Sequence, residues 1–170
     1  MRISPMVARA TATAIAFSAG GPAPVAYASG YGIELNGTYE AISNGEWAQT
    51  SEVFIDETTV RATWTIASSC SDPTECTGQV TSDQGWTARL RFSVDRWMLD
   101  HQVPNWIPCP DGTTAPGKQQ YRFFGYDNGK LDHTQTGQLA GADTTIGPSG
   151  ACGVNKPLVI EMPFTLRRIG

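Results

Sequence analysis

The clearest pattern in the chain is a strict alternation of apolar and polar residues in two stretches. In residues 59–69 the apolar positions share one parity, and these are Val60, Ala62, Trp64 and Ile66. In residues 86–94 they are Trp86, Ala88, Leu90, Phe92 and Val94. A period of two places apolar side chains on one face of a β-strand and polar ones on the other. The sequence therefore predicts two half-buried strands, with Trp64 and Trp86 facing the core.

Shorter extended stretches follow the same logic and are separated by turn residues such as Asn44-Gly45 and Asp127-Asn128-Gly129. They cover residues 35–41, 47–55, 77–81, 96–103, 121–126, 135–140 and 158–166. Pro163 falls on the outward parity of the last stretch, which indicates an edge or a bulge. Residues 104–117 and 141–156 are rich in Gly and Pro, and we expect two long loops there.

No helical periodicity of useful length occurs after the first 28 residues. The pattern therefore predicts an all-β protein, a single antiparallel meander of short strands. Closure of the sheet removes its edges, so we expect a barrel of about eight strands. A two-sheet β-sandwich is the alternative.

The start of the chain has the composition of a secretory signal. Arg2 and Arg9 are followed by a small apolar run over residues 10–19, and Ala26-Tyr27-Ala28 fits the small-x-small cleavage rule. We expect residues 1–28 to be a signal peptide and residues 29–170 to form a single β domain. The protein is then secreted, extracellular or attached to the cell envelope. No other run approaches the length of about 18 apolar residues that suits a membrane span, so we expect no transmembrane segment in the mature chain.

Charge narrows the range of partners. The chain carries 16 acidic and 12 basic residues, a net charge of −4 at pH 7, and the predicted leader removes two of the arginines. Phosphate binding needs clustered Lys and Arg, so a nucleic-acid partner is not expected. No polybasic run is present for an anionic membrane. We expect a monomer that binds a ligand or an envelope component.

Four cysteines, Cys70, Cys76, Cys109 and Cys152, all follow the predicted leader. An even number in an exported chain favours disulfides. Pairing of Cys70 with Cys76 across a Pro-containing turn is our first choice, and it leaves Cys109 with Cys152 to join the two long loops. The other two pairings stay possible. A metal site is disfavoured because no C-x-x-C occurs and only His101 and His133 are available. We therefore expect no metal and no cofactor.

Candidate ligand-contacting residues are gathered near the first of these loops. Trp106 and Asn105 precede Cys109 in a Pro-rich stretch, and Asp111 follows it. A tethered Trp beside two polar residues can stack on a sugar or cover an apolar cavity. It can equally plug the barrel end. Trp97, which lies near another turn, is the fourth candidate.

Catalysis receives less support, and we assign no catalytic residue. Ser149 lies in Gly-Pro-Ser-Gly-Ala, which is not a nucleophile elbow. A glycosidase pair such as Glu40 with Glu46 depends on a separation in space that the sequence does not give. The sequence thus favours a non-catalytic β-barrel module that binds a small apolar ligand, a glycan or a protein partner. The alternative is a cell-envelope hydrolase that uses carboxylates still to be identified.

Two family resemblances accompany this interpretation. The chain resembles small exported actinobacterial proteins, especially mycobacterial ones, through Leu35-Asn36-Gly37-Thr38-Tyr39, Ser43-Asn44-Gly45-Glu46-Trp47-Ala48, Thr63-Trp64-Thr65-Ile66, Gly85-Trp86, Cys109-Pro110-Asp111-Gly112, Ser149-Gly150-Ala151-Cys152-Gly153 and Met162-Pro163-Phe164-x-Leu166. That family brings context but no activity. The Gly37-x-Tyr39 pair with Arg167 or Arg168 is similar to the lipocalin-type barrel. There, a basic residue from the last strand covers an aromatic from the first.

Overall fold

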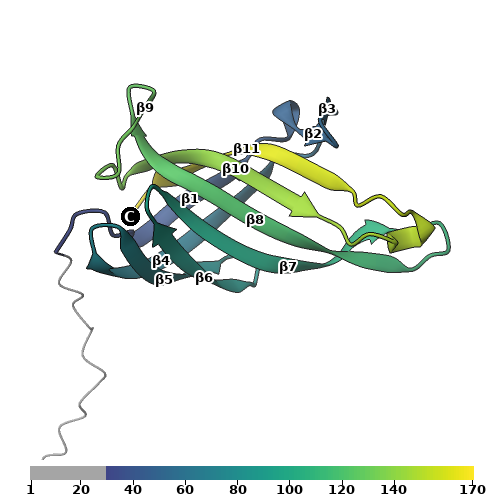
Figure 1. The fold of residues 1–170 in the computed structure, drawn as a ribbon, viewed down its shortest axis with the longest axis horizontal. Coiled ribbons are helices and arrows are strands. Elements are labelled where there is room, and N and C mark those ends of the chain that lie inside the picture. The colour runs from purple at the N-terminus through teal and green to yellow at the C-terminus, as the bar shows by residue number, and fades with distance from the viewer. Residues whose placement is uncertain (1–29) are drawn as a thin grey trace, which may run out of the picture.

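The structure, a computed structural model, describes residues 30–170, so the predicted signal peptide and its cleavage point lie outside the described residues. Eight antiparallel strands form a closed barrel (Figure 1). In barrel order they are β1 (Gly37–Ser43), β4 (Val60–Asp72), β5 (Glu75–Ser82), β6 (Thr87–Ser93), β7 (Arg96–Pro108), β8 (Thr114–Asp127), β10 (Gln138–Ile146) and β11 (Val159–Arg168). Closure comes from β11 pairing with β1, and the predicted barrel, not the sandwich, is confirmed.

Several short elements lie outside the eight barrel strands. The 3-10 helix η1 (Gly45–Trp47) leads into a small hairpin, β2 (Gln49–Thr50) and β3 (Val53–Phe54). This hairpin pairs with β11 through β2 and projects from the barrel (Figure 1). Two further short elements are β9 (Lys130–Leu131), which pairs with β8, and the 3-10 helix η2 (Ala151–Gly153). Within the described residues no helix has the length and apolar character needed to span a bilayer.

The barrel interior is filled by the side chains that the alternation predicted to face inward. Trp64 is 1% exposed, and its ring meets four other aromatic rings, those of Trp86, Tyr121, Phe123 and Phe164, at centroid distances of 4.9–6.4 Å. Leucine, isoleucine and valine side chains complete the core: Leu35, Ile66, Val80, Leu90, Leu99, Leu139 and Leu166. An apolar ligand deep in the barrel would have to displace this packing.

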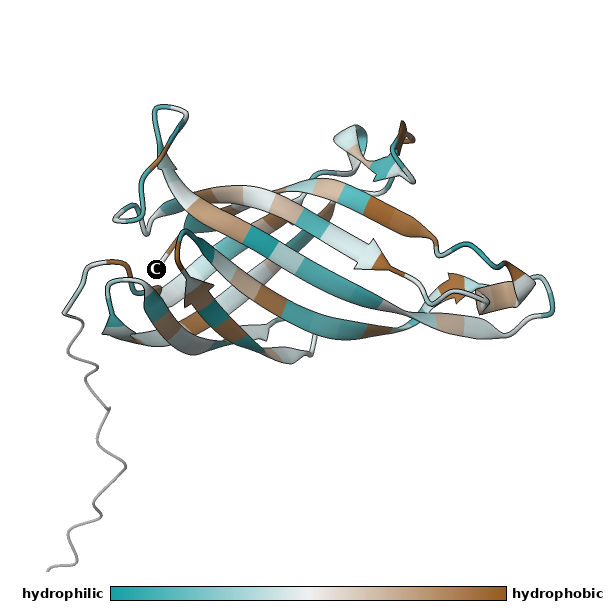
Figure 2. Ribbon diagram, viewed as in Figure 1, coloured by the Kyte–Doolittle hydropathy of each residue, from teal (hydrophilic) through white to brown (hydrophobic). Residues whose placement is uncertain are grey.

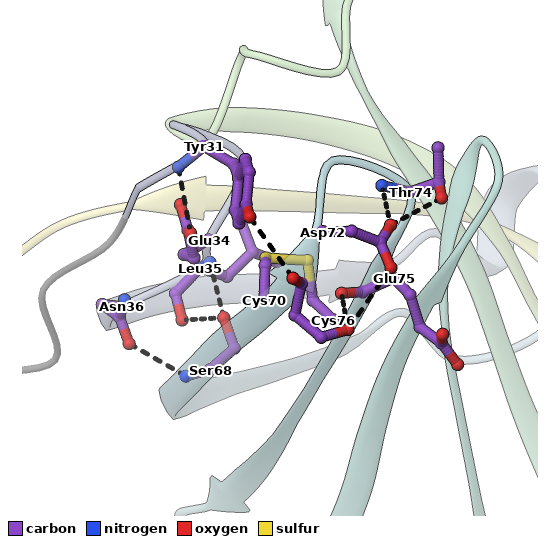
Figure 3. The surroundings of a disulfide bond; sticks show 11 residues. Tyr31, Glu34, Leu35, Asn36, Ser68, Cys70, Asp72, Thr74, Glu75 and Cys76 are labelled. Atoms are coloured by element: carbon purple, nitrogen blue, oxygen red, sulfur yellow. Dashed lines mark hydrogen bonds between the residues drawn. A yellow bond between two sulfur atoms is a disulfide. The ribbon is translucent and has the colours of Figure 1, made fainter.

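One end of the barrel is covered by the residues that precede β1. The backbone N–H of Leu35 donates to Ser68 Oγ (2.8 Å), and the N–H of Ser68 donates to Asn36 Oδ1 (2.9 Å). The Tyr31 hydroxyl donates to the Ser71 carbonyl (3.3 Å) beside the Cys70–Cys76 disulfide (Figure 3). These contacts attach the segment before β1 to β4, and Ile33 and Leu35 of this segment join the barrel core.

Two of the loops expected from the sequence are largely strand. Strands β7 and β8 run through the predicted loop 104–117 and leave only residues 109–113 as the turn. Their register shifts between Val103 and Ile107, and this irregularity accommodates Pro104, which has no backbone N–H to donate to the ladder. Strand β10 likewise extends through residues 141–146 of the second predicted loop. We use the name arm for residues 103–117 together with residues 147–158, the part that extends beyond the barrel (Figure 1).

The second disulfide holds the arm together. Cys109 and Cys152 are bonded, as are Cys70 and Cys76, so the predicted pairing is confirmed. Cys109 begins the turn of the β7–β8 hairpin, and Cys152 lies in η2. The expectation that this crosslink joins two long loops needs one correction: it joins the β7–β8 hairpin to the loop between β10 and β11.

Candidate functional site

Three of the four predicted contact residues lie in the arm, and the structure uses them to build it. Asn105 Oδ1 accepts a hydrogen bond from Thr114 Oγ1 (2.6 Å), and Asp111 Oδ1 accepts one from Thr113 Oγ1 (2.6 Å). Trp106 is half-buried and packs closely on Gly117. A side chain at position 117 would not fit, because its Cβ would lie 2.7 Å from the Trp106 indole. These contacts give all three residues a structural role in the arm.

The fourth candidate is separated from the others. Trp97 is 2% exposed and packs beside Phe92 in the barrel core, at a ring centroid distance of 5.2 Å. A ligand in solution therefore has no access to the Trp97 side chain in this conformation. The candidate site suggested by the sequence thus reduces to the arm.

A buried polar network, absent from the sequence prediction, lies among the aromatic rings. Asp143 on β10 is fully buried, and Ser43 Oγ donates to its Oδ2 (2.6 Å). Gln119 Nε2 donates to both carboxylate oxygens (2.8 Å each), and the Gln119 carbonyl Oε1 lies 2.7 Å from His101 Nε2. His101 in turn stacks on Trp86 with ring centroids 4.1 Å apart. The network ties β1, β7, β8 and β10 together inside the barrel.

Burial controls the proton affinity of this network. It raises the pKa of Asp143, and the hydrogen bonds from Ser43, Gln119 and Tyr121 and the charge of His101 oppose the rise only in part. Burial, with the nearby Asp143 carboxylate, also raises the pKa of Tyr121. Because the folded protein holds the Asp143 proton more tightly than the unfolded chain does, this group stabilises the fold below the unfolded pKa of about 3.9. That stabilisation is lost as the pH rises through the folded pKa.

We therefore expect Asp143→Asn to destabilise the protein most at acidic pH and less as the pH rises toward neutrality. Asparagine does not titrate, whereas wild-type Asp143 loses its contribution over this range. Carboxylates with lowered pKa, such as Glu40 and Asp100, are present in both proteins and cancel in the difference. Urea unfolding of both proteins between pH 4 and pH 7 measures this difference in the free energy of unfolding. A difference that stays constant or grows with pH contradicts this role of Asp143.

A hollowed surface lies between the β2–β3 hairpin and the arm. Two adjoining hollows of about 320 Å³ and about 460 Å³ share Ser51, Lys156 and Pro157. The smaller hollow is mainly apolar and is lined in the arm by Ile107, Ala151, Cys152, Val154 and Leu158. The larger is more polar and is lined by Gln49, Glu52, Val159 and Glu161. We refer to the two together as the hairpin–arm groove.

Large apolar side chains stand exposed on the hairpin next to Ser51 and Glu52, the turn residues that line this groove. Trp47 is 61% exposed, Val53 60%, Phe54 67% and Ile55 48%. Figure 2 shows hydrophobic segments on β3, at the start of β11 and in the arm. Ser51 and Glu52 form the tight turn between β2 and β3 with φ of 50° and 71°, which holds β3 in place. Clustered exposed apolar side chains of this kind mark interaction sites.

The hydrolase alternative finds no support in the described residues. Glu40 is held by Arg167 (2.9 Å) and Arg61 (3.9 Å), and the hydrogen bond from Arg167 lowers its pKa, which is the reverse of what a general acid requires. Ser149 Oγ donates to the Asn155 carbonyl (3.0 Å) and so serves its own loop. Across residues 30–170 no group of three or more His, Cys, Asp or Glu side chains is placed to hold a metal ion.

Comparison with solved structures places the fold beside a known sensor domain. The monomer form of the PknI sensor domain of M. tuberculosis is similar, with a TM-score of 0.57 over 81% of this chain and 88% of that chain. The sequence identity is 18%, so the likeness concerns the fold. No protein-family model and no curated protein matches the chain.

These findings bear on both resemblances. The structural neighbour is mycobacterial, which agrees in part with the resemblance to exported mycobacterial proteins. Tyr39 and Arg168 lie opposite each other in the β1–β11 ladder. No comparison supports membership of that family.

Proposed function

We propose that the protein is an exported, non-catalytic β-barrel module that recognises a protein partner through the hairpin–arm groove. The observation that carries the proposal is the cluster of exposed apolar side chains beside this groove, above all Phe54 at 67% exposure. The filled barrel interior supports a surface site over an internal ligand site. The sensor domain with the similar fold is a precedent for a recognition role, and the further step to this chain is our proposal.

The proposed compartment rests on disulfide chemistry. Both disulfides join cysteines in the described domain, and such bonds persist in oxidising compartments. Together with the predicted signal peptide this supports export to the extracellular space or the cell envelope. N-terminal sequencing of the protein from culture supernatant should begin at Ser29, whereas a full-length cytosolic product would overturn the compartment.

Recognition at the groove is tested by removing the apolar side chains of β3. We expect the double variant Val53→Ser/Phe54→Ser to keep its stability within about 0.5 kcal/mol, because both side chains are already exposed. A displayed library of random ten-residue peptides, panned on the wild type, should yield clones that this variant no longer retains.

The matched control removes exposed apolar side chains elsewhere. Val94 is 73% exposed in the β6–β7 turn and Leu131 is 47% exposed in β9, both at the other end of the barrel. The variant Val94→Ser/Leu131→Ser should retain the selected clones as well as the wild type does. Clones that bind all three proteins equally, or a library that yields none, would refute recognition at the groove.

A further inference from the structure

We infer that the segment recognised at the hairpin–arm groove is an extended, apolar stretch flanked by lysine or arginine. This inference rests on the proposed function and gives the partner its chemistry. It follows from the charges around the groove and from the free edge of β3, two features that the packing of the barrel does not require.

The segment that contains the hairpin beside the groove is acidic, and we call the four acids of this segment the rim. Residues 44–57 contain four acidic and no basic residues, namely Glu46, Glu52, Asp56 and Glu57, and all four are exposed. Among the described residues none of them lies within 4.0 Å of a cationic group in an ion pair. Glu52 and Glu161 are the two carboxylates that line the larger hollow, where Lys156 is the one basic lining residue. The rim therefore carries negative charge that the protein itself does not neutralise.

The edge of β3 favours an extended segment. Strand β3 pairs with β2 on one side and with no other strand of the described sheet on its second side. A free edge offers backbone N–H and C=O groups to an added strand, whose alternate side chains then meet those of the edge. Val53 and Phe54 would supply the apolar contacts, and the smaller hollow beside the arm would receive an anchor side chain.

The same charges disfavour the other occupants of such a surface. A second copy of the chain, paired edge to edge through β3, would bring Glu52 and Asp56 against the same acids of its twin. Charged residues at an edge strand commonly prevent this kind of self-association. An anionic lipid surface would meet the same repulsion. Cationic flanks on the partner turn the acidic rim into an attraction that steers binding.

The first test is the composition of the clones selected in the library experiment. We expect lysine and arginine to be enriched, and aspartate and glutamate depleted, in the clones that require Val53 and Phe54. Clones that require those residues but show no bias toward basic residues would overturn the charge inference and leave recognition at the groove intact. The two proposals therefore fail in different ways.

The second test measures charge directly with synthetic peptides. A hairpin-dependent clone is made in three versions, with its flanking residues changed to Lys, Gln or Glu, and the change in tryptophan fluorescence of the protein reports binding. We expect affinity in the order Lys, Gln, Glu. Neutralisation of the rim in Glu46→Gln/Glu52→Gln/Asp56→Asn/Glu57→Gln should weaken the Lys version about tenfold and leave the Gln version nearly unchanged.

Salt and remote charges provide the controls. Raising NaCl from about 0.1 M to about 1 M shortens the screening length from about 10 Å to about 3 Å, so the advantage of the Lys version should disappear. Glu75→Gln/Asp127→Asn, which removes two exposed acids at the opposite end of the barrel, should have no effect. Equal affinity of the three peptides, or equal loss in the rim and remote variants, would refute the inference. So would concentration-dependent dimers in sedimentation that Val53→Ser/Phe54→Ser abolishes.

Discussion

Replacement of Trp64 with alanine is expected to lower the free energy of unfolding by about 3–5 kcal/mol. Trp64 projects from β4, is 1% exposed and meets aromatic rings of β8, across the barrel from its own strand, and of β11, which lies beyond β1. Its removal leaves a cavity between rings that are fixed by closed ladders on both sides. A closed barrel cannot collapse easily into such a cavity, so we expect a value in the upper part of this range.

Equilibrium unfolding in urea, followed by circular dichroism, measures this loss of stability. The slope of the unfolding free energy against urea concentration should stay unchanged. Thr65→Ala is the matched control, because Thr65 is the next residue of β4 and faces solvent. It should change stability by less than about 0.5 kcal/mol. A loss below about 1 kcal/mol for Trp64→Ala would mean that the inward face of β4 had been assigned wrongly.

The variant Trp64→Phe separates the effect of the cavity on stability from the effect of the buried indole N–H. The indole Nε1 of Trp64 is buried and has no hydrogen-bond partner among the described residues. Phenylalanine keeps part of the ring volume and removes this donor, whose burial has a free-energy cost of its own. The variant should therefore lose much less stability than the alanine variant does.

Strands whose inward residues are mainly apolar could be predicted from the sequence, and stretches with mainly small or polar inward residues could not. Alternation in β4 and β6 is complete, and both strands were predicted within a few residues. Strand β10 places Gly141, Asp143 and Thr145 inward, so it has no hydrophobic period. Those small and polar residues make room for the Ser43–Asp143–Gln119 network, which only the closed barrel assembles from three strands.

The candidate site was predictable only in part for a related reason. The cysteines indicated the crosslink of the arm because the cysteines of an exported chain usually form disulfides with one another. The hairpin beside the groove carries three consecutive exposed apolar residues, Val53-Phe54-Ile55. A run without alternation predicts a buried strand as readily as an exposed one. Its exposure depends on β2 pairing with β11 outside the barrel, which is a long-range contact that local pattern does not encode.

The crosslink of the arm leads to the second large expected effect. The double variant Cys109→Ser/Cys152→Ser should lose about 3–4 kcal/mol of stability in the chain-entropy account, because the bond spans a sequence separation of 43 residues. Cys70→Ser/Cys76→Ser, which opens a separation of 6 residues, should lose about 2 kcal/mol. Chemical unfolding of the two variants compares them, and peptide mapping without reduction verifies both pairings.

The two disulfide variants should also differ in what they do to the groove. Cys152 lines the smaller hollow, and η2 has few buried contacts of its own, so the arm without its crosslink should open locally before the barrel unfolds. Limited proteolysis should then cut within residues 147–158, and the affinity for hairpin-dependent peptides should fall although the hairpin is intact. Loss of Cys70–Cys76, at the far end of the barrel, should leave that affinity unchanged. If both variants bind these peptides as the wild type does, the arm is not a wall of the site and recognition depends on the hairpin alone.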